Sequence, residues 1–269
     1  MQLKSARVLL TGASGGLGQA LARQLAAAGA ELLLAGRDAD KLRHLQQSLP
    51  GHHAIVQADL NDAAGITAVA RAANEFPIDA LINNAGIGCF GLLEQQPWAE
   101  VEQVLVTNLA TPIRLTQAVL AGLKARPAAA VVNIGSTFGS IPFAGFAAYS
   151  SAKAGLRGFS QALRRELADT RVAVIHIAPR AIETALNSPA VNALNRALKN
   201  RSDSADEVAA KIIAALQRGD RERHIGFPER LFAWLNGALP AVIDQGLAGK
   251  LAAIKHHATH SRTTTKDQP

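Results

Sequence analysis

The sequence is poor in cysteine, in aromatic side chains and in long apolar runs. Cys89 is the one cysteine among 269 residues, so neither an intrachain disulfide nor a multi-cysteine metal site can form. No apolar stretch reaches the roughly 18 residues that a membrane-spanning helix needs. The first residues also turn to glycine too early for the core of a signal peptide. These features favour a soluble, cytoplasmic protein without a metal site.

Acidic side chains are fewer than basic ones. The 28 Lys and Arg residues exceed the 21 Asp and Glu residues, which gives a formal net charge of +7. The basic residues are spread along the chain, and aromatic residues make up only 4%, so no run combines the two as a nucleic-acid surface would. We expect a basic, solvated surface and no nucleic-acid partner.

Short runs of Val, Ile and Leu alternate with longer segments of helical periodicity. The runs predict strands over residues 7–11, 31–35, 54–58, 80–83, 130–135 and 172–178, and helices over 17–28, 41–49, 63–73, 101–125 and 152–168. Apolar strands separated by helices indicate a parallel sheet covered on both faces. We therefore predict a Rossmann-like, doubly wound α/β fold of about seven strands. It forms one domain over residues 1–255, with a C-terminal extension from about residue 228 and a disordered polar tail over 256–269.

Two further patterns mark helix ends. Ser204, followed by Glu207, reads as a capping box that opens a helix through about Leu216. Gly29 stands where a helix would end in a left-handed residue before the second strand.

Glycines cluster where the first predicted strand meets the first predicted helix, at Gly12, Gly15, Gly16 and Gly18. Glycine lets the backbone turn sharply and approach a ligand closely. The helix N-terminus adds unpaired N–H groups and a partial positive charge. This context predicts a loop that binds the pyrophosphate of a dinucleotide, with a tight structural turn as the alternative.

The end of the second predicted strand distinguishes NAD from NADP. A carboxylate there would accept hydrogen bonds from the adenosine ribose of NAD and repel a 2′-phosphate. This sequence instead has Arg37, whose guanidinium could hold that phosphate. Asp38 follows directly and is better placed to cap the next helix. The cofactor predicted from these residues is NADP(H).

Four polar residues suggest proton-transfer chemistry. Tyr149 and Lys153 are four residues apart, so both project from one face of a helix. The ammonium, with an oxidised nicotinamide, would lower the pKa of the phenol and make it an acid–base catalyst. Ser136 could hydrogen-bond the substrate oxygen, and Asn108 could hold a water that links Lys153 to solvent. Taken singly, each has a structural alternative as a surface pair, a turn or a cap.

Together these residues resemble the short-chain dehydrogenase/reductase family, in its NADP-preferring single-domain form. The resemblance covers roughly residues 5–230 and includes the TGxxxGxG pattern at 11–18 and Asn-Asn-Ala-Gly at 83–86. It implies a catalytic tetrad of Asn108, Ser136, Tyr149 and Lys153, and homodimers or homotetramers. Beside Tyr149 and Lys153, it implies cofactor contacts from Gly12, Ser14, Gly15, Gly16, Leu17, Gly18, Arg37, Asp59, Leu60, Asn84, Ala85, Gly86, Pro179, Ile182 and Thr184. Asp59 would meet the adenine, or alternatively cap a helix. Ile182 and Thr184 match the segment that meets the nicotinamide carboxamide.

The chemistry predicted from this reading is the interconversion of a hydrophobic ketone or aldehyde and its alcohol. Phenylalanines cluster around the motifs at Phe90, Phe138, Phe143 and Phe146, and residues 185–200 are expected to form a lid. A 3-oxoacyl-carrier-protein-type reductase, or a non-catalytic NADP(H)-binding sensor or scaffold, are the alternatives.

Two features depart from the family pattern. Arg180 stands where the family usually has glycine, and it could face an anionic substrate group or simply solvent. Residues 227–254 are predicted to form two short helices, because glycine and proline interrupt their apolar pattern. This extension could cover the substrate cleft, pack on another subunit or touch a membrane surface.

Overall fold

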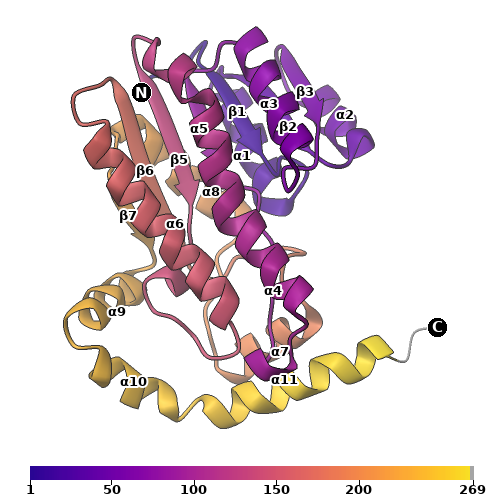
Figure 1. Cartoon of the computed structure of the whole chain (residues 1–269), viewed down its shortest axis with the longest axis vertical. Coiled ribbons are helices and arrows are strands. Elements are labelled where there is room, and N and C mark those ends of the chain that lie inside the picture. The colour runs from indigo at the N-terminus through magenta and orange to yellow at the C-terminus, as the bar shows by residue number, and fades with distance from the viewer. Residues whose placement is uncertain (267–269) are drawn as a thin grey trace.

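Seven parallel strands form one sheet in the order β3-β2-β1-β4-β5-β6-β7 (Figure 1). The computed structural model describes residues 1–266, with side-chain surroundings through residue 259. The strands are β1 (Arg7–Thr11), β2 (Glu31–Gly36), β3 (His53–Gln57), β4 (Ala80–Asn83), β5 (Ala129–Ile134), β6 (Val172–Pro179) and β7 (Glu222–Ile225). Because β1 pairs with both β2 and β4, the chain winds outward in two directions from the sheet centre. The predicted doubly wound fold is confirmed, and the six strands predicted individually lie within one residue of their observed bounds.

Helices cover both faces of the sheet. Leucine-rich sides of α1 (Gly16–Ala27), α2 (Ala39–Ser48) and α8 (Ala205–Arg218) share one core cluster with β1, β2 and β4. The opposite cluster joins α3 (Ala63–Glu75), α5 (Thr111–Lys124) and α6 (Ala147–Glu166). Burial on both faces explains why the strands are nearly continuous apolar runs. The carboxyl ends of the strands therefore form one edge, where loops can carry a site.

The helix predicted over residues 101–125 is longer and contains an irregularity. α4 (Trp98–Leu105) continues through a π turn (Val106–Ala110) into α5. By length and composition this stretch could cross a membrane, but Leu115 and Leu123 pack it into the core beneath the sheet. Two 3₁₀ turns, η1 (Leu93–Gln95) and η3 (Thr137–Gly139), complete the elements near the carboxyl edge.

The predicted helix ends are confirmed. The Ser204 hydroxyl accepts from the Glu207 N–H while the Glu207 carboxylate accepts from the Ser204 N–H, and α8 extends two residues beyond the expected end. The Asp38 carboxylate accepts from the Lys41 N–H at the start of α2. Gly29 has φ +84° and follows the last turn of α1.

The C-terminal part forms an arm of helices beyond the carboxyl edge of the sheet (Figure 1). α9 (Phe227–Ala238) and α10 (Pro240–Ala248) are the two predicted short helices, and α7 (Pro189–Ala197) lies beside α11 (Leu251–Lys266). The expected disordered tail from residue 256 is corrected, because α11 continues to Lys266. Ile254 and Ala258, one turn apart, are both buried and hold this helix on the body. Residues 267–269 lie outside the described residues.

Candidate active site

The glycine loop after β1 is shaped by close backbone contacts. Gly12 has φ +62°, and a Cβ there would lie 2.8 Å from the Ala85 Cα. A Cβ on Gly18 would lie 2.1 Å from the Gly12 carbonyl oxygen, so both positions require glycine. The first turn of α1 has no acidic residue, and its cap Gly15 supplies no side chain to the N–H groups. These groups remain available to an anion, and the cradle fits the pyrophosphate of a dinucleotide.

The other predicted residues of this loop have different surroundings. The Ser14 carbonyl accepts from the Gln19 side chain, which fixes the turn into α1. Leu17 is buried and belongs to the core cluster, so its backbone is the part that faces the loop. A Cβ on Gly16 would lie 2.9 Å from the Thr184 methyl carbon, which places residue 184 directly over the start of α1.

The segment after β4 holds the glycine loop in place. The Asn84 amide donates to the carbonyls of Thr11 and Gly12, and the N–H groups of Asn84 and Ala85 donate to the Thr11 hydroxyl. A Cβ on Gly86 would lie 2.7 Å from the Asn108 Oδ1. Asn84, Ala85 and Gly86 therefore connect the expected pyrophosphate cradle with the expected catalytic residues.

The residues expected at the adenosine end lie at the carboxyl ends of β2 and β3. The Arg37 side chain is exposed, and no ion pair of its guanidinium occurs within the described part of the chain. Asp38 is occupied as the cap of α2 and in an ion pair with Lys41, and the backbone hydrogen bond holds the pKa of its carboxyl below the usual value. No carboxylate therefore stands free at the end of β2.

Asp59 and Leu60 behave differently from one another. The Asp59 carboxylate is exposed and accepts from the Asn61 N–H, whereas Asp62 caps α3, so the alternative of Asp59 as the helix cap is wrong. Leu60 turns its side chain into the core with Ile66. Only the backbone of Leu60 is therefore available for the predicted cofactor contact.

Three of the four expected catalytic residues lie together above β5. Tyr149 and Lys153 project from one face of α6, with the Lys153 Nζ 5.7 Å from the centre of the Tyr149 ring. Ser136 follows β5, where its hydroxyl accepts from the Phe138 N–H, and it lies close enough to the Tyr149 hydroxyl to lower the pKa of that phenol. The Lys153 ammonium donates to the Ile134 carbonyl at 2.9 Å, which anchors α6 to the end of β5.

Burial dominates the electrostatics of this group when no cofactor is bound. Burial raises the pKa of the Tyr149 phenol, and the nearby Ser136 opposes this only in part. Burial also lowers the pKa of Lys153 to about 8. The sequence predicts a phenol made acidic by its ammonium neighbour, but in the protein alone the desolvation of both groups dominates. At neutral pH the phenol therefore carries its proton and can donate it.

Asn108 is placed by the π turn. The wider turn carries a buried side chain whose amide donates to the carbonyls of Ile87 and Val104. Its Oδ1 accepts from the Ile87 N–H at 3.2 Å. Both amide protons are thus used within the protein, and the expected water would have to bind at the remaining lone pair of Oδ1. The side chain anchors the loop after β4 beside Lys153.

Arg180 has neither of its expected environments. Its guanidinium donates two hydrogen bonds to the Asp203 carboxylate, at 2.6 and 3.1 Å, and pairs with Glu229 at 3.5 Å. The side chains of Arg180 and Asp203 are only 18% and 7% exposed. Arg180 therefore faces neither solvent nor an anionic substrate group. Instead it ties the loop after β6 to the segment before α8 and to α9 in the extension.

The rest of that loop passes over the glycine cradle. The Pro179 carbonyl accepts from the Thr137 hydroxyl, and Ile182 forms a β-bridge with Asp203. With Thr184 against Gly16, the loop closes over the region where the nicotinamide end of a dinucleotide is expected. No group of three or more His, Cys, Asp or Glu side chains suited to a metal occurs in the part of the chain that is described.

The predicted phenylalanine cluster is present beside Tyr149. The rings of Phe138 and Phe143 stack at 5.2 Å, and Phe146 and Phe138 each meet the Tyr149 ring edge-on. Leu194 of α7 and Ile254 of α11 close this cluster from the other side. The expected lid over residues 185–200 thus contains α7, and sequence reasoning missed Ile254 because it lies outside the family motifs. The four-residue spacing of Ile254 and Ala258, which puts both on one face of a helix, was the sequence signal that could have revealed it.

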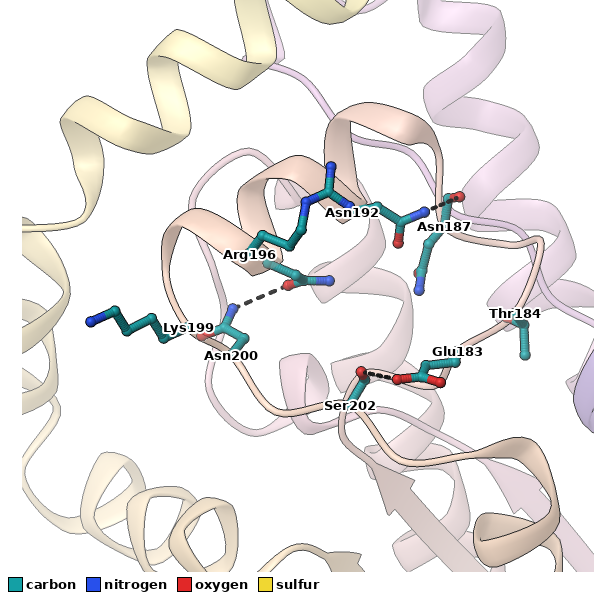
Figure 2. Close-up of a pocket in the computed structure, with 9 residues that line it drawn as sticks. Glu183, Thr184, Asn187, Asn192, Arg196, Lys199, Asn200 and Ser202 are labelled. Atoms are coloured by element: carbon teal, nitrogen blue, oxygen red, sulfur yellow. Dashed lines mark hydrogen bonds between the residues drawn. The ribbon is translucent and has the colours of Figure 1, made fainter.

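The outer side of the lid is polar. A cavity of about 500 Å³ is lined by Asn187, Asn192, Arg196 and other polar residues of the loop and α7 (Figure 2). The Asn192 amide points toward Asn187, and Asn200 donates to Asn195. The two sides of α7 therefore differ, with Leu194 on the aromatic cluster and asparagines on the cavity.

Comparisons with known proteins agree with this geometry. The family model for short chain dehydrogenases matches residues 6–195. A 3-oxoacyl-[acyl-carrier-protein] reductase of Salmonella typhimurium is 34% identical over 186 residues, 68% of this chain and 76% of that protein. The uncharacterized oxidoreductase DltE of Bacillus subtilis is 31% identical over 227 residues, 82% of this chain and 88% of that protein.

Two solved structures are also similar. The closed form of a serine dehydrogenase complexed with NADP⁺ superimposes with a TM-score of 0.74 at 27% identity, over 81% of this chain and 94% of that one. A short chain dehydrogenase/reductase from Burkholderia phymatum in complex with NAD has a TM-score of 0.82 at 21% identity, over 90% of this chain and 96% of that one, and supports the fold. With the glycine cradle and the Ser136–Tyr149–Lys153 arrangement, these matches show that the chain belongs to the short-chain dehydrogenase/reductase family of nicotinamide-dependent oxidoreductases.

Proposed function

We propose that this protein is an NADP(H)-dependent oxidoreductase that interconverts a hydrophobic ketone or aldehyde and its alcohol. The observation that carries the proposal is the position of Tyr149: it lies close to Ser136, and its ring contacts the buried Lys153 and a cluster of phenylalanines. A non-catalytic sensor would need the glycine cradle but no proton donor, so it accounts for less of this site.

Each of the four residues has a separate role in the proposed reduction. When bound, NADPH supplies the hydride to the carbonyl carbon. Ser136 donates a hydrogen bond to the carbonyl oxygen, where negative charge develops, and Tyr149 donates its proton to the same oxygen. Lys153 holds the ribose hydroxyls of the cofactor and returns a proton to Tyr149. Asn108 keeps the neighbouring loop in place and offers its Oδ1 to the water that completes the relay.

A substrate panel tests this proposal directly. Purified protein is given NADPH with hydrophobic ketones, aldehydes and acyl thioesters, and the loss of NADPH absorbance is followed. We expect turnover with at least one apolar carbonyl compound and a large loss of turnover in the Tyr149→Phe variant. NADPH binding without turnover on any of these substrates would instead favour the sensor.

The choice of NADP(H) rests on Arg37. This exposed cation stands at the end of β2, and the neighbouring carboxylate of Asp38 is used as a helix cap. Arg37→Ala should weaken NADPH binding about tenfold, because a charge-assisted hydrogen bond to the 2′-phosphate is worth about 1.5 kcal/mol or more. NADH binding should not change. The control is Arg43→Ala, since Arg43 is an exposed arginine on the following helix, α2, and pairs with Asp40. Equal losses for NADPH and NADH would refute the assignment.

Reduction of a 3-oxoacyl group on a carrier protein is the second candidate. It is favoured by the 34% identity to the 3-oxoacyl-[acyl-carrier-protein] reductase of Salmonella typhimurium. The two candidates differ in the molecule that carries the acyl group. A carrier-protein reductase should act on a carrier-linked 3-oxoacyl substrate with a much lower KM than on the same acyl group attached to a short thiol. Equal KM values for both would favour the small hydrophobic carbonyl compound.

We also propose a homodimer or homotetramer. The outer faces of the long α4–α5 and α6 helices are the surfaces that we expect to meet, as the family resemblance implies. Analytical ultracentrifugation at several protein concentrations tests this, and a monomer at all of them would refute it.

A further inference from the structure

Large apolar side chains are exposed mainly on the C-terminal arm. Of the ten large hydrophobic residues that are exposed in the described part of the chain, six lie within residues 227–242. We call these the α9–α10 patch: Phe227, Leu231, Phe232, Trp234, Leu239 and Val242. Phe227 is 81% exposed and Trp234 is 69% exposed. Single exposed apolar residues are ordinary, but a group of this size on two consecutive helices marks an interaction surface.

The two helices turn these side chains outward while other residues hold them on the body. Phe227, Leu231 and Trp234 follow one another at helical spacing, so they share one face of α9. On the inner side Ala233 is buried, and the Asn236 amide donates to the Ser140 carbonyl. On α10 the inward residue is Ile243. Each helix therefore already packs on the protein through other residues, and the apolar face is not needed to hold it there.

The charges near the patch are mostly positive. Residues 227–255 contain Arg230, Lys250 and Lys255 against two acids, Glu229 and Asp244, but the Lys250 ammonium lies 5.9 Å from the centre of the buried Phe143 ring, so Arg230 and Lys255 are the cations left at the surface. Glu229 is turned inward to Arg180, so Asp244 is the acid of this segment left at the surface. A groove of about 440 Å³ is lined by Phe227, Arg230, Leu231 and Trp234 of α9 and, on the side of the body, by Arg157 of α6 and by Glu222 and His224 of β7. Aromatic and aliphatic tips interleaved with basic side chains suit the interface of a lipid bilayer, where apolar groups enter the acyl layer and cations meet anionic headgroups.

We propose that the α9–α10 patch docks this protein on the surface of an anionic lipid bilayer. The arm stands away from the sheet, and the turn between α9 and α10 forms an outer corner of the molecule (Figure 1). A corner inserts into a planar, deformable layer more readily than it matches a rigid protein surface. Two copies meeting symmetrically through the patch would place two Arg230 side chains in one apolar interface, which disfavours that contact.

Vesicle co-sedimentation of the full-length protein tests the proposal. The probes are vesicles of phosphatidylcholine alone and of phosphatidylcholine with phosphatidylglycerol. We expect binding to the anionic vesicles, weaker binding to the neutral ones, and a decrease as salt screens the headgroups. Trp234→Ser should lower the partition coefficient about tenfold, which is the effect expected for loss of one large apolar side chain from the acyl layer.

The chain offers a matched control for that variant. Trp98 on α4 is the other tryptophan, and its 68% exposure nearly equals that of Trp234. Trp98→Ser should leave vesicle binding unchanged, and circular dichroism confirms that both variants fold. In a Trp98→Phe background, the fluorescence of Trp234 should shift to the blue on adding anionic vesicles.

Three results would overturn the proposal. The first is no sedimentation with either kind of vesicle, and the second is an equal effect of the two tryptophan variants. The third is a change in sedimentation coefficient on Trp234→Ser in the absence of any vesicle binding, which would make the patch an interface between copies of this chain. None of these measurements depends on the substrate or on turnover, so the proposed enzymatic function stands or falls separately.

Discussion

Replacing Arg180 by methionine probes the link between the loop after β6 and the C-terminal arm. The substitution keeps much of the side-chain length and removes the guanidinium. It leaves the carboxylates of Asp203 and Glu229, which are 7% and 23% exposed, without the cation that pairs with both. The change in packing at residue 180 contributes little to the loss of stability, because most of that loss comes from burying carboxylates that no longer have a paired cation.

The magnitude follows from that burial. Breaking a largely buried ion pair by removing one partner costs about 3–5 kcal/mol of unfolding free energy. At about 2–4 °C per kcal/mol for a domain approaching this size, Tm should fall on the order of 10 °C. Asp203→Asn added to Arg180→Met should recover part of the loss, since it removes one of the two unpaired charges. The natural control is Arg218→Met: Arg218 also donates two hydrogen bonds to one aspartate, Asp220, but is 50% exposed, so solvent screens the pair and its loss should cost little stability.

The assay is urea unfolding followed by circular dichroism at one protein concentration, so that any change of assembly is held constant. If Arg180→Met loses no more stability than Arg218→Met, the ion cluster does not hold the loop, and the reasoning from its burial is refuted. A selective rise in KM for acidic substrates at unchanged stability would restore the rejected hypothesis that Arg180 faces the substrate.

Three further predictions concern proton transfer and pH. Tyr149→Phe should lower kcat roughly 10²- to 10⁴-fold and leave the Kd of NADPH, measured by fluorescence titration, nearly unchanged; near-normal turnover would remove Tyr149 from its role. Because burial lowers the pKa of Lys153 to about 8, its ammonium is lost above that pH, so NADPH should bind more weakly from about pH 8 upward. Lys153→Met should bind weakly at every pH, and a profile that still bends near pH 8 would contradict this. Burial lowers the pKa of His176 to about 3, so between pH 6.5 and 3 the unfolded chain binds a proton that the folded protein does not. Unfolding free energy should then fall by about 1.4 kcal/mol per pH unit of acidification from this group, and His176→Leu should reduce that slope in urea titrations.

The parts of the fold that sequence reasoning found are those with local signals. A strand covered on both faces must be apolar throughout, so β1 and β4 can be recognised in the sequence as runs of aliphatic residues. The capping box of α8 is equally local, because Ser204 and Glu207 satisfy one another within one turn. The glycine loop can also be recognised from local sequence, since close contacts around the turn require glycine at Gly12 and Gly18.

Other elements have no local signal. β7 (Glu222–Ile225) is a four-residue edge strand in which Glu222 pairs with Arg157 of α6 and His224 is hydrogen-bonded to the Ser140 hydroxyl, so no apolar run marks it. The π turn at Asn108 changes only the hydrogen-bond register of a helix whose apolar periodicity continues on both sides. The raised pKa of the Tyr149 phenol also depends on how deeply the fold buries it, and the spacing of Tyr149 and Lys153 carries no information about burial.

Much of what surrounds the catalytic group comes from outside the family match, which ends at residue 195. The partners of Arg180 are 23 and 49 residues further along the chain, and Ile254 packs on the phenylalanine cluster beside Tyr149. The same arm carries the α9–α10 patch, so one continuous stretch of helices joins the outer apolar corner to the wall of the substrate site. The cradle and the proton donor lie within the family match, whereas these contacts from the arm lie outside it. Sequence reasoning from the matched region alone therefore misses Ile254, which packs on the phenylalanine cluster beside Tyr149.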